Sequence, residues 1–239
     1  MKKHDCNIKS SLTAFALFTG LAITAQANSD ITWSTPQTIS GASDVSTLGT
    51  TLYAFTAYGG AQQTVNGVPF QYLASFTFDS VYGGLPSAGT PDASYNTALS
   101  GFHYNNVANN NFAYTHDSDF AGLTVGHTYQ IEFWLSDTRN LGFTRGEYLS
   151  GGADTYGTDT SAEVLYPADG TSAGQYITGT FTADSTVEVV AFTPVASING
   201  DAAGQLNMYQ VRDITSAPEP TTLTLVGVGS LALLFRKRK

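Results

Sequence analysis

The strongest constraint on the fold is an alternation of apolar and polar side chains in the middle of the chain. It is clearest in residues 127–136, where every second side chain is large and apolar. Because a β-strand places successive side chains on opposite faces of a sheet, this pattern predicts a strand with one face against a core. The apolar set is Tyr129, Ile131, Phe133 and Leu135. No amphipathic helical stretch is found between residues 28 and 217.

Further alternating segments predict additional strands separated by turn-forming residues. These segments are residues 51–57, 65–78, 175–183, 186–192 and 205–214. Asn66-Gly67 is a strong signal for a hairpin turn. Two stretches rich in small and polar residues, 83–111 and 150–162, are expected to be long surface loops. The pattern predicts an all-β fold: a single antiparallel β-sandwich of jelly-roll type over residues 28–212, followed by a short linker, 213–217.

The charge of this central segment excludes one large class of function. Residues 28–217 hold three arginines and no lysine against seventeen acidic residues, a formal balance of −14. Such a surface repels phosphate backbones, so we expect no nucleic-acid partner. Cys6 is the only cysteine of the chain, and it lies outside this segment. The body is therefore expected to have no disulfide and to depend on core packing.

The N-terminal 27 residues have the three parts of a secretory signal peptide. Three lysines precede an apolar stretch, residues 12–23, which is too short to span a membrane stably. Ala25 and Ala27 then supply the small side chains that signal peptidase accepts. We expect cleavage after Ala27, with a mature chain beginning at Asn28. The alternative is a buried N-terminal helix.

The C-terminal end, residues 218–239, also has three parts. Pro218-Glu219-Pro220 is followed by an uncharged apolar segment, 223–235, and then by four basic residues: Arg236, Lys237, Arg238 and Lys239. A helix over residues 221–235 would be about 22 Å long, shorter than the roughly 30 Å hydrocarbon core. Long basic side chains can extend to the interface, so a short transmembrane helix is expected. The basic end should stay cytoplasmic, which places the body outside the inner membrane.

This order of Pro-Glu-Pro, short apolar helix and basic end resembles the PEP-CTERM sorting signal of Gram-negative bacteria. The resemblance covers about the last 22 residues. It implies recognition of Pro218, Glu219 and Pro220 by exosortase, a membrane transpeptidase-like protease. It also implies export, transient contact with the inner membrane through the C-terminal helix, and a final place at the cell surface or in the extracellular matrix. Such proteins occur in bacteria that make exopolysaccharide and biofilm. The alternative is an ordinary single-span tail anchor.

One group of residues in the body is a candidate ligand site. Asp137, Arg139 and Arg145 follow the best-predicted strand, and arginine is otherwise scarce in the body. A guanidinium can hold a sugar hydroxyl pair or a carboxylate, and Trp134 could stack on a sugar face. The alternative is an ion pair, Asp137–Arg139 or Arg145–Glu147, that orders the loop.

A second group of residues suggests a cation. Asp154, Asp159 and Glu163 lie in or beside a glycine-rich segment, and oxygen ligands at short spacing suit calcium. The spacing does not match an EF-hand loop. We expect no other cofactor.

These features favour a non-enzymatic exported protein with a structural or adhesive role in exopolysaccharide or biofilm. Residues 123–139 resemble strands of secreted β-sandwich and carbohydrate-binding modules, so the alternative is a module that holds extracellular polysaccharide. A secreted polysaccharide hydrolase or lyase is the third hypothesis. No nucleophile motif such as Gly-x-Ser-x-Gly is present.

Overall fold

The computed structural model of the chain describes residues 31–57, 62–74, 76, 78, 80–105, 116–151, 162–170, 172–195 and 204–215. The expected signal peptide, 1–27, and the sorting tail, 218–239, lie outside these residues. Within the described ranges, no helix is long and apolar enough to cross a membrane.

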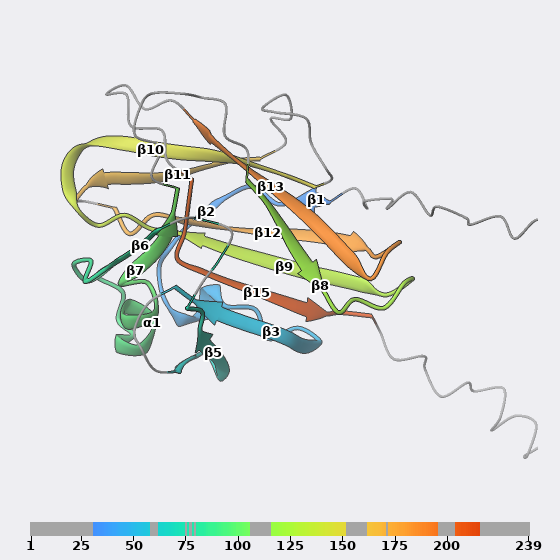
Figure 1. Ribbon diagram of the computed structural model, residues 1–239. Helices are drawn as coiled ribbons and strands as arrows, with labels where there is room; N and C mark the ends of the chain where they lie inside the picture. Colours follow the sequence, from blue (N-terminus) through green and yellow to red (C-terminus); the bar gives the residue numbers. More distant parts are fainter. Residues whose placement is uncertain are drawn as a thin grey trace, which may run out of the picture.

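The body is built mainly from strands, as expected. The largest sheet has eight strands (Figure 1). Along its path these are β1 (Thr32–Trp33), β12 (Gln175–Thr182), β9 (Thr128–Leu135), β15 (Met208–Asp213), β3 (Thr50–Thr56), β5 (Val68–Tyr72) and β4 (Gln63–Val65), with β2 (Gln37–Thr38) also paired to β12.

A four-stranded sheet faces the large one, and a small sheet lies beside them (Figure 1). The four-stranded sheet has the order β11 (Ala162–Asp169), β10 (Asn140–Gly151), β13 (Val187–Val195) and β8 (His116–Ala121). The small sheet has the order β14 (Gln205–Leu206), β7 (Gly101–Tyr104) and β6 (Ser80–Gly83). Two short helices complete the described body, the 3-10 helix η1 (Ala42–Asp44) and the α-helix α1 (Ala93–Ala98).

The main core lies between the two larger sheets. Side chains from β9, β12 and β15 meet side chains from β10, β11 and β13, and aromatic rings dominate the contact. Phe133 of β9 packs at 5.2 Å from Phe192 of β13, ring centre to ring centre, with the rings nearly perpendicular. Tyr209 of β15 packs against Phe120 of β8 at 5.5 Å. Edge-to-face contacts of this kind add to the area that each ring buries.

A second core covers the opposite face of the large sheet. Trp134 and Met208 point to this side, where the β4–β5 hairpin and α1 cover them. Phe70 packs edge-on against the Trp134 indole at 5.8 Å, and Tyr95 of α1 is fully buried. The large sheet is therefore covered by apolar groups on part of both faces.

The strand with the clearest alternation behaves as predicted. β9 runs from Thr128 to Leu135, and its odd-numbered apolar residues all lie in the core between the sheets. The predicted hairpin at Asn66-Gly67 is also confirmed, because Val65 and Val68 are register partners on either side of it. Both turn residues have positive φ, 48° and 76°, as a tight hairpin turn requires.

Two fold predictions were wrong in detail. The large sheet is mixed rather than purely antiparallel, because β3 and β5 pair in parallel through Phe55↔Gln71 and Thr56↔Tyr72. The segment 83–111 was expected to be a loop, but it contains α1 and β7. A six-residue helix is too short to show helical periodicity, and α1 depends instead on Asp92, whose carboxylate accepts the Tyr95 N–H at 2.7 Å.

The body extends further toward the C-terminus than the predicted linker allows. Asp213 is the last residue of β15, and Ile214 donates its N–H to the Thr128 carbonyl at 2.9 Å. Thr128 in turn donates its N–H to the Thr215 hydroxyl at 2.8 Å. Residues 213–215 are therefore attached to the start of β9.

Candidate functional site

The three charged residues singled out in the sequence form one cluster at the end of β9. Asp137 lies two residues beyond β9 and is fully buried. Arg139 grips it in a bidentate pair, with Nε at 2.7 Å from Oδ1 and Nη2 at 2.6 Å from Oδ2. Arg145, from β10, reaches the same Oδ2 with Nη1 at 3.4 Å. The hydrogen bonds to Asp137 are the main cause that raises the pKa of the Arg139 guanidinium.

Aromatic rings support the Arg139 guanidinium from the small sheet. The guanidinium carbon lies 4.7 Å from the centre of the Tyr82 ring and 5.2 Å from that of Phe102. The two rings stack on each other at 5.4 Å. Tyr82 is 37% exposed, whereas Phe102 is buried. Arg139 and Tyr82 thus form an adjoining, partly exposed surface, which we call the Arg139–Tyr82 face.

A buried amide positions the chain just before this cluster. Asn207, between β14 and β15, accepts the Ser136 N–H at 2.7 Å. Its side-chain amide donates to the carbonyls of Leu99 and Gly101 at 3.1 and 2.9 Å. These bonds tie the end of β9 to the segment between α1 and β7. Because the amide oxygen and the amide nitrogen of Asn207 are both buried and hydrogen-bonded, the cluster is supported by a fixed polar network.

Glu147, on the inner face of β10, does not pair with Arg145 as one alternative had it. Glu147 is completely buried, and its Oε2 accepts the Gln205 N–H at 3.0 Å. The other carboxylate oxygen, Oε1, has no hydrogen-bond partner among the described residues. Burial raises the pKa of Glu147 well above its ordinary value, and the bond from Gln205 opposes this only in part. A neutral carboxylic acid is therefore favoured at this position.

Trp134 is part of the second hydrophobic core and not of the charged cluster. Its side chain is fully buried between the Phe70 ring and the Tyr176 ring, which stacks at 6.4 Å. Because the indole is not exposed to solvent, it cannot stack on a bound sugar as the sequence suggested. The aromatic side chain beside the arginines is instead Tyr82, which the sequence did not single out.

The calcium prediction is only partly covered by the structure. Glu163 lies on β11 with an exposed side chain, while Asp154 and Asp159 lie outside the described residues. In the part of the chain that the structure describes, no group of three His, Cys, Asp or Glu residues could hold a metal ion.

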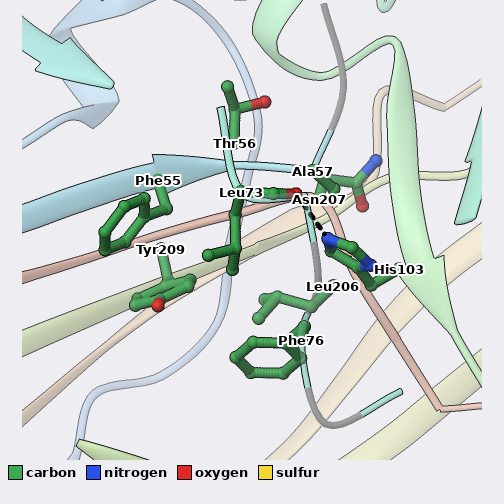
Figure 2. Close-up of a pocket in the computed structure, with 9 residues that line it drawn as sticks. All are labelled: Phe55, Thr56, Ala57, Leu73, Phe76, His103, Leu206, Asn207 and Tyr209. Carbon is green, nitrogen blue, oxygen red and sulfur yellow. Dashed lines mark hydrogen bonds between the residues drawn. The ribbon is translucent and has the colours of Figure 1, made fainter. Parts of the chain in front are cut away.

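A separate pocket lies between β3, β7 and β15 (Figure 2). The space between its lining side chains is about 150 Å³, which includes volume open to solvent, and it leaves no enclosed room for even a water molecule, so it is not a ligand-sized cavity. His103 is its main polar group, and the imidazole Nε2 donates to the Leu73 carbonyl at 3.0 Å, as Figure 2 shows. Burial lowers the pKa of His103. Phe55, Phe76 and Tyr209 fill much of the remaining lining, so the pocket is mainly a packing feature of the core edge.

Sequence reasoning missed Tyr82 and Phe102, and it named Glu147 only as an alternative partner of Arg145, not as a buried carboxyl group. Glu147 carried a usable signal, because it alternates with Leu149 and so falls on the inward face of β10. Tyr82 and Phe102 carried none, since their neighbours gave no strand pattern and their contact with Arg139 joins distant segments.

The chemistry open to the cluster is binding rather than proton transfer. Two guanidinium groups hold the Asp137 carboxylate, so its oxygens are already engaged in hydrogen bonds within the protein. Arg139 keeps about a fifth of its side chain exposed beside the Tyr82 ring. A guanidinium plane next to an aromatic ring can contact hydroxyl groups and the apolar face of a sugar.

The comparisons with known proteins bear mainly on the C-terminal end. Residues 216–239 match the family model of the PEP-CTERM protein-sorting motif. The resemblance inferred from Pro218-Glu219-Pro220 and the basic end is thereby confirmed. The motif supports an exported protein that is sorted and processed by exosortase.

The body itself has little measurable similarity to known proteins. No curated protein matches the chain at a significant level. Among solved structures, the extracellular domain of ANXUR2 from Arabidopsis thaliana aligns with a TM-score of 0.36 and 12% identity. The alignment covers 72% of this chain and 52% of that one, so the chain spans about half the length of the plant domain. A likeness at this level carries no argument about fold or function.

Proposed function

We propose that this chain is a non-enzymatic protein of the cell surface or extracellular matrix of a Gram-negative bacterium, with a structural or adhesive role in exopolysaccharide or biofilm. The observation that carries the proposal is the sorting motif at residues 216–239, directly behind a β-rich body whose described part ends at Thr215. Signal peptidase would remove residues 1–27, and exosortase would then process the tail.

Three of the buried acids of the described body, Asp137, Glu147 and Glu132, lie apart from one another, and this supports a non-enzymatic role. Asp137 is committed to two arginines, and Glu147 faces the core between the sheets. Glu132 alternates with the core residues of β9 and so faces the opposite side of the large sheet from that core. It is held there by Ser46, Thr178 and Gln210. Glycoside hydrolysis needs two carboxyl groups that face one cleft.

The experiment that tests the proposal compares the location of two variants in cells that contain exosortase. Pro218→Ala/Pro220→Ala should stay in the inner-membrane fraction, because the protease loses its extended recognition segment. The unchanged chain should appear on intact cells and fractionate with extracellular polysaccharide. Thr221→Ala/Thr222→Ala, next to the motif, is the matched control. If the proline variant and the unchanged chain distribute alike, the sorting role is refuted.

A carbohydrate-binding module is the second candidate, and the Arg139–Tyr82 face favours it. Recombinant residues 28–217 on a glycan array, with and without calcium, would test it. Binding should be lost in Tyr82→Ala and in Arg139→Ala, and retained in Tyr72→Ala, which removes an equally exposed tyrosine on β5. Silence of the unchanged body across the array would refute this candidate. An effect of calcium would favour the cation site at Asp154, Asp159 and Glu163.

We also propose that the body is a jelly roll. Supporting this, the central strands of the large sheet follow the order β12-β9-β15-β3, and the facing sheet has the order β11-β10-β13-β8. Following these eight strands along the chain, every connection except β10–β11 crosses from one sheet to the other. Such crossing is the connectivity of two interlocked Greek keys.

A further inference from the structure

Two large apolar side chains are exposed at the end of the body where β15 leads into the C-terminal tail. Leu48 and Val125 are each 58% exposed, the highest values among the large apolar side chains of the described residues. They are far apart in sequence. The fold nevertheless places each of them beside the last residues of β15.

Leu48 is fixed next to the end of β15 by its backbone. The Leu48 carbonyl accepts the Arg212 Nε–H at 2.5 Å, and the Gly49 carbonyl accepts from Nη2 of the same residue at 3.1 Å. A Cβ at Gly49 would lie only 2.1 Å from the Asp213 carbonyl oxygen, so the two backbones are in direct contact. The Leu48 side chain is left in solvent beside this contact.

Val125 lies in the connection between β8 and β9, which contacts the end of β15 on its other side. Gly126, the next residue, donates its N–H to the Ala183 carbonyl at 2.7 Å. His127 then donates from Nδ1 to Asp213 Oδ2 at 2.7 Å. Figure 1 shows this turn, the start of β3 and the tip of β15 at one end of the body. We call this end, with Leu48 and Val125 at its surface, the exit end.

The chain beyond the exit end is short. Thr215 is hydrogen-bonded to Thr128, and Pro218 follows three residues later. Three Cα–Cα steps span at most about 11 Å, and the six steps to Thr221 about 21 Å. The helix expected over residues 221–235 begins there. If that segment enters the bilayer, the exit end is tethered beside the headgroups, where even weak contacts are strengthened by the high local concentration.

We propose that the exit end is a lipid-contacting surface, which inserts Leu48 and Val125 into the membrane interface while the sorting tail is still attached. This inference rests on the proposed function, because the tail must be membrane-embedded. Apolar side chains gain free energy on leaving water, and an interface accepts them without a dedicated pocket. The acidic groups at the exit end, Asp184 and Asp213, favour a neutral over an anionic lipid surface, because the guanidinium of Arg212 there is buried against the Leu48 and Gly49 carbonyls.

The test uses the exported chain from a host that lacks exosortase, so that the tail remains attached. Leu48→Trp and Val125→Trp are each mixed with vesicles of brominated phosphatidylcholine, and unbrominated vesicles serve as the reference. Leu141→Trp is the matched control, since Leu141 is 44% exposed at the start of β10, which follows the end of β9 that lies away from the exit end. After subtraction of the signal from Trp33 and Trp134, emission at both exit-end positions should fall by about half, as expected 5–10 Å into the boundary.

The outcomes separate the two proposals. Flotation of the full chain, but not of a chain ending at residue 215, reports that the tail inserts. Flotation without quenching at 48 and 125, or with equal quenching at 141, overturns the lipid-contacting surface and leaves the proposed function standing. Absence of flotation overturns both. A further outcome, in cells that contain exosortase, is that Leu48→Asp is processed less than the unchanged chain while the tryptophans at 48 and 125 show no quenching by lipid. That combination would assign the exit end to a protein partner and would also overturn the proposal.

Discussion

Two acidic residues near the end of β9 are kept inside the protein in different ways. Asp137 is paired with two arginines, whereas Glu147 accepts one hydrogen bond, from the Gln205 backbone N–H. A buried charge is tolerated when it is paired, and an unpaired carboxyl tends to stay protonated. We therefore expect substitutions at these two residues to change the free energy of unfolding in different ways.

Glu147 should make the body less stable as pH rises. Burial raises its folded-state pKa above the unfolded value of about 4.3, so between these values the folded chain holds the extra proton. The contribution of Glu147 to the free energy of unfolding is fully present below its unfolded-state pKa and is lost as the pH rises through its folded-state pKa. In urea titrations across pH, Glu147→Gln should become progressively more stable relative to the unchanged body.

The matched control for that experiment is Glu163→Gln. Its side chain is exposed on the neighbouring strand β11, so this variant makes the same chemical change at a carboxyl group that is not buried. If the Glu147→Gln and unchanged curves run parallel with pH, Glu147 does not carry a buried proton.

Removing Asp137 should be costly because it leaves two arginines without their carboxylate. We expect Asp137→Ala to lose about 3–5 kcal/mol of unfolding free energy, as for other broken buried pairs. Arg139→Ala should cost less, because Arg145 still reaches Asp137 at 3.4 Å. In a double-mutant cycle the two effects should couple by about 0.5–3 kcal/mol. Additive losses would show that the bidentate pair contributes no net stability.

At the scale of elements, the exit of β15 depends on a close backbone approach at Gly49. Gly49 and Gly67 both have positive φ, 65° and 76°, so alanine at either position carries backbone strain of about 1 kcal/mol. Only at Gly49 would the added Cβ also meet a backbone carbonyl, that of Asp213, whereas at Gly67 it meets nothing within 4 Å.

Gly49→Ala should therefore lower the melting temperature more than Gly67→Ala does. The Gly67→Ala shift should be about 2–4 °C for a body of this size. Calorimetry of the two variants measures the difference. Equal shifts would mean that the end of β15 is free to move away from Gly49.

The elements that could be predicted from sequence are those whose signal is local. β9 was predictable because its alternating side chains are sorted between two environments, and the Asn66-Gly67 hairpin because its turn residues require positive φ. β10 was missed because it starts with an irregularity between Asn140 and Phe143 and contains glycine and charged residues. No local pattern reports the β10 pairing with β13.

The candidate site follows the same division. The Asp137–Arg139 pair was foreseeable because the two residues are two positions apart in one loop. Arg145 was expected either at this cluster or beside Glu147, and the strand register placed it on Asp137. The Asn207 network joins residues up to 108 positions apart, and the Tyr82 contact also bridges distant segments. Contacts of this kind appear only after the sheets are assembled.

At the scale of the whole molecule, an acidic body whose described part ends at Thr215 is followed directly by the sorting motif, residues 216–239. The central claim is that both chain ends serve delivery and are removed. Intact-mass measurement of the protein recovered from its own cells tests this most directly. We predict a chain that begins at Asn28 and has lost the apolar and basic residues beyond Pro220. A mass that still includes residues 1–27 and 221–239 would contradict the account.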